Sequence, residues 1–343
     1  MPVYEIDPLG DSRWVRFVSQ HTKATIFHTP EWLDALRRTY RYHAAALTTS
    51  APHTELKSAV VFCRVESWLT GRRVVSVPFS DHCAPLVDNE EQLACLLARL
   101  TDECGFGRGR YVEIRPVDCA LAPGFSESAQ FCLHRLDLRP NLDEVFRGFH
   151  ANSVRRMISR AMREPFVYRE GRSEALLQSF YDLAVLTRRR QRLPPQPLAW
   201  FWNLIGCFGE RLKIRMLFHS GRPAAGILTL RFGRTMTYKY GFSDKEFHRL
   251  GSVQLLLWKA IQEAKQEGLV EFDMGRSDWS NEGLVTFKDR WGCARTSIAY
   301  LRFPAKEALP SGSLMMRIAR QLLAVAPESV LPTAGNVLYR HMA

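Results

Sequence analysis

The stretch that decides the fold runs from Tyr238 to Gly292 and reads YKYGFSDKEFHRLGSVQLLLWKAIQEAKQEGLVEFDMGRSDWSNEGLVTFKDRWG. Within it, apolar residues recur at helical spacing from Val253 to Ala264, which predicts a helix with one buried face. Gly268 stands just past this helix, where a glycine commonly ends one. An alternating strand is expected at 235–241, before the helix, and a short apolar strand at 269–274, after it.

Working backwards from this stretch, two more alternating strands are expected at 212–218 and 224–232. The order of elements is therefore three strands, one helix and one strand. The N-terminal half repeats this order more loosely after a first helix at 30–40. Its expected strands and helix are, in chain order, 44–48, 58–66, 73–77, the helix 90–102, and 110–115.

Two copies of one unit make the predicted fold class α/β (α+β), with a mixed sheet flanked by helices in each copy. Proline and asparagine interrupt the pattern at 139–141. We therefore predict one domain at 1–140, a second at 141–305, and a C-terminal tail at 306–343. Helical spacing within 313–325 predicts an amphipathic tail helix, which could dock on the protein or lie on a membrane surface.

The composition narrows the class of protein. Among 343 residues, 46% are hydrophobic and 24% charged, as in a globular protein, and no apolar run is long enough to span a bilayer. No secretory leader is expected. The eight cysteines show no C-x-x-C pair, so we expect reduced thiols. The expected location is therefore the cytoplasm, either free or at the inner face of the membrane. The net charge of +12 favours polyanionic partners without choosing among tRNA, coenzyme A and membrane lipids.

Arginine is concentrated between residues 147 and 192, where eleven arginines accompany four acidic residues. Apolar residues between Val154 and Ala161 follow helical spacing, and four of the arginines, including Arg155 and Arg156, lie off that stripe. Such a pattern fits a solvated helix face. It fits equally a surface that binds phosphate, because guanidinium groups pair with phosphate oxygens.

The candidate chemistry lies where the expected strand ends at Asp273 and Gly275 allows a sharp turn into a polar loop at 276–283. An aromatic residue and a lysine, Phe287 and Lys288, follow this loop. A carboxylate near an ammonium suits attack of an amine on an acyl carbonyl, since the carboxylate can orient or deprotonate the amine. The ammonium can stabilise the oxyanion, and one such donor is typically worth about 3 kcal/mol.

The same stretch resembles the C-terminal signature of the Fem-type acyltransferases and their relatives in the GNAT superfamily. The family's F-D-x-G and F-K-x-x-W-G pieces are matched at 272–275 and 287–292, and its helix at 256–268. The resemblance extends to pieces at 27–32, 77–81, 155–161, 180–181, 187–190 and 194–195. It implies tandem GNAT-like domains and acyl transfer without a covalent enzyme intermediate, with Phe287 and Lys288 at the reactive ester.

The resemblance implies an amine acceptor from a cell-envelope or polysaccharide precursor and a donor that is either aminoacyl-tRNA or acyl-CoA, with no tightly bound cofactor and no metal. In the acetyltransferases a glycine-rich loop holds the pyrophosphate of coenzyme A. Here Gly251 and Ser252 occupy that loop, but the bulky Val253 departs from the pattern. Two rival functions stay open: a non-catalytic protein that binds polyanions, and a CoA-dependent N-acetyltransferase of small molecules.

Several residues are predicted to bind substrate. Tyr238 and Tyr240 alternate on one strand and should share a face, where they contact either the acceptor or the core. The other candidates are Arg155, Arg156, Arg188, Arg189, Arg276 and Trp291.

Overall fold

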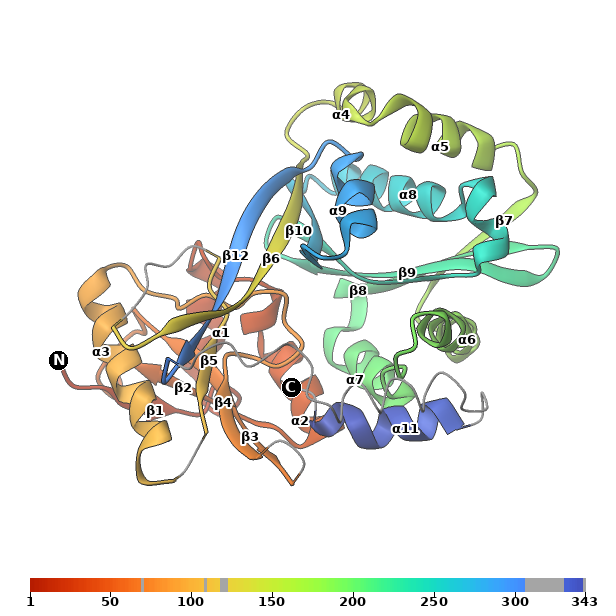
Figure 1. Cartoon of the computed structure of the whole chain (residues 1–343). Coiled ribbons are helices and arrows are strands. Elements are labelled where there is room, and N and C mark those ends of the chain that lie inside the picture. The colour runs from red at the N-terminus through yellow and green to blue at the C-terminus, as the bar shows by residue number, and fades with distance from the viewer. Residues whose placement is uncertain (69–70, 108–109, 118–122, 306–329, 342–343) are drawn as a thin grey trace. The chain divides into compact units, whose positions relative to one another are not determined.

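The computed structural model describes residues 1–68, 71–107, 110–117, 123–305 and 330–341, which form two compact units (Figure 1). Unit 1 comprises the described residues within Met1–Phe131, Ser297–Ser311 and Val337–Ala343, and unit 2 those within Cys132–Thr296 and Gly312–Asn336. The tail helix expected at 313–325, and with it the expected membrane contact of the tail, lies outside the described residues. Among the described residues, no helix has the length and apolar character needed to cross a membrane.

The limits of the two units differ from the predicted domain limits. Residues 132–140 belong to unit 2, and residues 297–305 belong to unit 1. The cause is strand β12 (Ala294–Phe303), whose last residues pair with β5 (Val112–Ile114) through Leu301 and Ile114. Strand pairing between residues far apart in the chain leaves no mark in local periodicity.

Unit 1 has a mixed sheet in the order β1-β2-β3-β4-β5-β12. Its first four strands pair antiparallel, and β4 and β5 pair parallel. Helix α3 (Glu90–Thr101) packs its leucines against one face of this sheet, while α1 (Ser12–Gln20) and α2 (Pro30–Tyr40) bury Trp14 and Trp32. The helices α2 and α3 and the strands β2 to β5 lie close to their expected positions, whereas β1 and α1 were not predicted. The strand bounds are β1 (Tyr4–Ile6), β2 (His43–Thr48), β3 (Val60–Ser67) and β4 (Gly71–Val75).

Unit 2 has its sheet in the order β6-β11-β10-β9-β8-β7. Strands β7 to β10 pair antiparallel in succession, and β10 pairs parallel with β11. Because a parallel pair needs a crossover connection, α8 (Ser252–Gln266) links β10 to β11. The strand bounds are β6 (Ser126–Asp137), β7 (Phe166–Gly171), β8 (Leu212–His219), β9 (Arg222–Phe232), β10 (Thr235–Ser243) and β11 (Glu271–Asp278).

Helices cover both faces of the unit 2 sheet (Figure 1). Strand β9 shows this directly, because Ala225 and Ile227 belong to the core under α8 whereas Gly226, between them, lies against Phe180 of α6. Alternate residues of a strand point to opposite faces, so α8 and α6 lie on opposite sides. The α8 side also carries α4 (Leu142–Gly148), the π-helix η3 (Ala151–Arg155) and α5 (Arg156–Ala161), and the other side α6 (Glu174–Arg190) and α7 (Leu198–Phe208).

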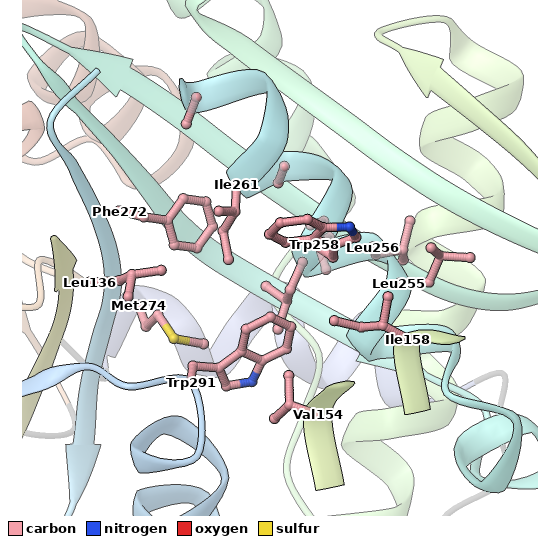
Figure 2. Close-up of a cluster of buried hydrophobic side chains, with 14 of the residues drawn as sticks. Leu136, Val154, Ile158, Leu255, Leu256, Trp258, Ile261, Phe272, Met274 and Trp291 are labelled. Atoms are coloured by element: carbon pink, nitrogen blue, oxygen red, sulfur yellow. The ribbon is translucent and has the colours of Figure 1, made fainter. Parts of the chain in front are cut away.

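The core under α8 joins elements that are distant in the chain, as Figure 2 shows. Trp258 and Ile261 of α8 meet Phe272 of β11, Ile158 of α5 and Trp291. Complete burial of a large apolar side chain stabilises a fold by about 2–3 kcal/mol, so this cluster contributes strongly to the stability of unit 2. The apolar stripe predicted between Val154 and Ala161 is confirmed as the buried side of η3 and α5.

A buried histidine should give unit 1 a pH-dependent stability. His28 has no exposed surface; its Nε2 lies 2.9 Å from the carbonyl oxygen of Ala84, and its Nδ1 accepts a hydrogen bond from the Thr25 amide at 3.1 Å. Burial lowers the pKa of His28 from 6.5 to about 4. The folded state therefore favours the neutral ring, and this stability is complete above pH 6.5 and lost as the pH falls to about 4.

We expect the free energy of unfolding to drop by about 3 kcal/mol between pH 6.5 and pH 4 through this residue alone. Urea denaturation at a series of pH values measures it. The variant His28→Gln cannot take up the proton, so its stability should change less over the same range. An equal loss in both proteins would contradict the assignment.

Candidate active site

The predicted carboxylate lies in the interior of unit 2. Asp273 is on β11, paired in register with Thr237 of β10, and only 4% of it is exposed. Its Oδ1 accepts a hydrogen bond of 2.7 Å from the amide of Gly275. Gly275 has φ of 70°, a left-handed conformation that glycine adopts without strain and that turns its amide back onto the carboxylate.

The strand does not end at Asp273, which corrects the expected bounds. Strand β11 continues through Gly275 to Asp278, and helix α9 (Glu282–Asp289) begins after a short connection. The expected polar loop at 276–283 is thus mostly strand and helix. Asn281 caps α9 by accepting a hydrogen bond from the amide of Leu284.

The predicted lysine, Lys288, contacts the same backbone turn as Asp273. Lys288 is in the last turn of α9 and is 3% exposed. Its Nζ donates to the carbonyl oxygens of Gly275 at 2.8 Å and Arg276 at 3.0 Å. The peptide units around Gly275 are therefore held by Asp273 through the amide and by Lys288 through the carbonyl. The carboxylate and the ammonium predicted from the sequence do meet at one glycine.

A neighbouring thiol responds to both charged groups. Burial raises the pKa of Cys293 to about 12, while the nearby Lys288 lowers it and the nearby Asp273 raises it. The Cys293 thiol is thus within electrostatic range of both Lys288 and Asp273, in a part of the protein interior that holds little water. Charges in such surroundings act more strongly than in solvent, which is the condition for stabilising an oxyanion. Among the described residues, no group of three or more His, Cys, Asp or Glu side chains is placed to hold a metal ion.

Three further residues fasten the end of α9, and sequence reasoning missed them. Asp289 lies 3.1 Å from Nε2 of His134 and forms an ion pair with Arg295. Hydrogen bonding from Arg295 lowers the pKa of Asp289, and burial lowers the pKa of His134, so the ring is neutral near pH 7 and donates through Nε2. His134 is fully buried on β6, and its only signal in the sequence is an ordinary strand alternation.

The prediction that Tyr238 and Tyr240 share a face is wrong. The pairing of β10 with β9 shifts by one residue between them, which is a β-bulge at Lys239. Tyr238 packs against the core under α8, where burial raises its pKa to about 12. Tyr240 points to the opposite side, accepts a 2.8 Å hydrogen bond from Trp200 Nε1, and packs on Phe201.

Two more candidates take structural positions. Trp291 has no exposed surface and lies in the core under α8 (Figure 2). Phe287 is half-buried against the same core, with its ring centroid 6.3 Å from that of Trp291.

The candidate arginines are spread over unit 2. Arg156 and Arg189 are exposed. Arg155 is half-buried at the end of the π-helix η3. Arg188 lies over the ring of Phe242 at 5.9 Å. Of the arginines, the contacts bring Arg276 to the Asp273–Lys288 site, through its backbone carbonyl.

The loop proposed to hold a cofactor is closed on one side by protein. Gly251 has φ of 80° and caps the start of α8, and Ser252 is buried, with its Oγ donating to the carbonyl of Phe247. A Cβ on Gly251 would overlap the carbonyl oxygen of Met157 in α5 and lie 3.3 Å from Ala161. The close backbone approach that this glycine permits is therefore made by α5.

Part of unit 2 is similar to a known family. Residues 148–288 match the family described as Acetyltransferase (GNAT) domain. The matched region holds Asp273, Lys288, Gly251 and the β-bulge. A comparison with curated proteins gave no match.

Solved structures resemble the chain over nearly its full length. FemX aligns with a TM-score of 0.68 and 14% identity, covering 87% of this chain and 97% of FemX. The C-terminal domain of a putative lysylphosphatidylglycerol synthetase from Agrobacterium fabrum aligns at 0.55 and 12%, covering 96% and 98%. A tandem GNAT protein from the clavulanic acid biosynthesis pathway aligns at 0.56 and 11%, covering 91% and 99%. The predicted fold class, mixed sheets flanked by helices in a tandem GNAT-like arrangement, is confirmed.

Proposed function

We propose that the GNAT domain of this chain catalyses N-acyl transfer to an amine of a cell-envelope or polysaccharide precursor. The observation that carries the proposal is the convergence of Asp273 and Lys288 on Gly275. The left-handed turn at Gly275 directs its amide to the Asp273 carboxylate and its carbonyl to the Lys288 ammonium, so a base and a cation are held close together in an interior with little water.

In the proposed reaction the amine nitrogen attacks the acyl carbonyl carbon and forms the new C–N bond. The ester C–O bond or the thioester C–S bond of the donor then breaks, and the leaving oxygen or sulfur takes up a proton. The Asp273 carboxylate accepts the proton that the amine loses. Lys288 stabilises the negative charge that develops on the carbonyl oxygen. No bond to the enzyme forms at any stage.

The donor is proposed from the surroundings of Gly251. Acyl-CoA and aminoacyl-tRNA both carry a reactive acyl group, but a pyrophosphate at the start of α8 needs access to the backbone of Gly251. The carbonyl of Met157 lies on one side of that backbone. This favours aminoacyl-tRNA, whose acyl ester does not depend on a pyrophosphate cradle, and a cytoplasmic reaction.

The acceptor class is supported by the resemblance of residues 272–292 to the Fem-type signature. One structural neighbour is a putative lysylphosphatidylglycerol synthetase, whose name refers to a membrane lipid and not to an amine acceptor. Neither determines the acceptor of this chain. Phe287, half-buried beside Lys288, would face the acyl ester in this proposal.

A donor screen tests the function. The full chain is incubated with charged tRNAs or with acyl-CoAs and with amine-bearing envelope precursors, and products are identified by mass spectrometry. We expect an amide product that disappears when the tRNA is digested with RNase beforehand. Product from acyl-CoA that is insensitive to RNase would instead support the CoA-dependent N-acetyltransferase.

A second candidate function rests on the burial of Lys288. A lysine that is 3% exposed and donates to two carbonyls can also be a structural residue. A non-catalytic protein of this kind would bind polyanions through its arginines, with affinity that falls steeply with salt, and would give no product with any donor.

A further inference from the structure

One end of unit 2 combines exposed arginines with exposed apolar side chains. Helix α5 leads through a short turn into β7 (Figure 1). Between residues 147 and 169 the chain has six arginines and a single acidic residue, Glu164. The arginines exposed from α5 to β7 are Arg156, Arg160, Arg163 and Arg169. Arg160 lies 3.5 Å from Glu164, so this acid offsets part of one charge.

Two large apolar side chains are exposed at this edge of the sheet. Val167 alternates with Phe166 and Tyr168, which pack on the core under α8, so Val167 points to the face opposite α5 while Met162 lies on the α5 side. Met162, at the end of α5, is 58% exposed, and Val167, on β7, is 52% exposed. Pro165, between them, is also exposed. The buried side of α5 is complete without them, since Ile158 and Ala161 face the core. Met162 and Val167 therefore contribute little to the fold and expose apolar surface to water at a measurable cost.

A pocket of about 240 Å³ opens beside this segment. Its lining mixes apolar side chains, among them Met162, Phe166 and Leu217, with the charged side chains of Glu164 and Lys259. The ammonium of Lys259 lies 4.7 Å from the ring centroid of Tyr168, another lining residue. Met162 thus lines this pocket as well as being exposed to solvent.

We propose that the exposed side chains of residues 156–169 form a contact surface for an anionic lipid membrane, defined here as the α5–β7 surface. The arginines attract acidic headgroups, and Met162 and Val167 enter the boundary between headgroups and acyl chains. The phosphates of RNA would also pair with the arginines, but they offer no apolar surface against which Met162 and Val167 could be buried. The proposal does not depend on acyl transfer.

Vesicle sedimentation tests the proposal. The full chain is mixed with vesicles of phosphatidylcholine alone or of phosphatidylcholine with phosphatidylglycerol. We expect binding to the anionic vesicles only, weakened by salt. The double variant Arg160→Gln/Arg163→Gln should bind about 25-fold more weakly, because each basic residue near an anionic surface contributes on the order of fivefold.

The decisive variant is Met162→Ser/Val167→Ser, which removes apolar surface without changing charge. We expect it to bind anionic vesicles about tenfold more weakly, since membrane affinity scales with the apolar area buried. Val15→Ser/Val337→Ser is the matched control, because Val15 and Val337 are 60% and 54% exposed and lie outside the α5–β7 surface. It should bind like the wild type, and all variants should keep the wild-type Tm.

Two results would overturn the proposal. The first is equal binding of the serine variant and the wild type to anionic vesicles. The second is wild-type protein that binds tRNA but sediments with neither kind of vesicle, which would assign the arginines to RNA. A competition assay with tRNA and the same vesicles separates these cases.

Discussion

Replacement of Lys288 by methionine should lower kcat/KM for the acyl-transfer reaction by a factor of about 100 or more, because one positioned oxyanion donor contributes on the order of 3 kcal/mol. Methionine keeps the length and volume of the side chain but cannot donate to the carbonyls of Gly275 and Arg276. Steady-state kinetics with the donor found in the screen measure the effect.

The same change also costs stability, and a control must separate the two effects. Loss of one partner from a buried hydrogen bond typically costs about 1–3 kcal/mol. Lys265 provides the control, since its Nζ also donates to two backbone carbonyls of unit 2, those of Leu138 at 2.5 Å and Arg139 at 3.1 Å. Lys265 is only half-buried, so Lys265→Met should lose less stability than Lys288→Met, and it should keep its activity. Full turnover by Lys288→Met would remove Lys288 from the mechanism.

Replacement of Gly251 by alanine should destabilise unit 2 by about 3 kcal/mol or more. A left-handed conformation costs an ordinary residue about 1–2 kcal/mol, and overpacking against a rigid neighbour about 1–3 kcal/mol more. The neighbour here is the backbone carbonyl of Met157, which cannot turn aside as a side chain would. Urea denaturation measures the loss.

Gly268 isolates the contribution of that contact. It has φ of 73°, close to that of Gly251, but a Cβ at Gly268 would meet nothing within 4 Å. Gly268→Ala should therefore show the conformational cost alone. If Gly251→Ala were as stable as Gly268→Ala and instead bound acyl-CoA more weakly, Gly251 would serve a pyrophosphate and the preference for an aminoacyl-tRNA donor would be wrong.

Much of the fold could be predicted because its elements follow local rules. The helix α8 and the strands β8 to β10 show clear periodicity, and the structure places them within a few residues of their expected bounds. The limits of the units could not be predicted, because they depend on the pairing of β12 with β5. Such a contact depends on residues about 190 positions apart, and no local pattern records it.

The candidate site shows the same division. Asp273 and Lys288 could be found because each stands in a distinctive motif. His134 could not, because its role depends on Asp289 reaching it from a distant helix. The assignment of Tyr240 to the same face as Tyr238 failed because alternation assumes regular pairing, and one extra residue in β10 breaks it.

The extra residue in β10, Lys239, determines which face of the sheet each side chain of this strand points to. Before the bulge, Met236 and Tyr238 supply the core under α8, and after it Tyr240 and Phe242 supply the aromatic cluster with Phe180 and Phe201. A single-residue insertion or deletion on either side would turn one of these pairs to the wrong layer while the other stayed in place. The bulge thus lets one strand supply side chains to the core on both faces of the unit 2 sheet. The number of residues in β10 is therefore constrained more tightly than their identity.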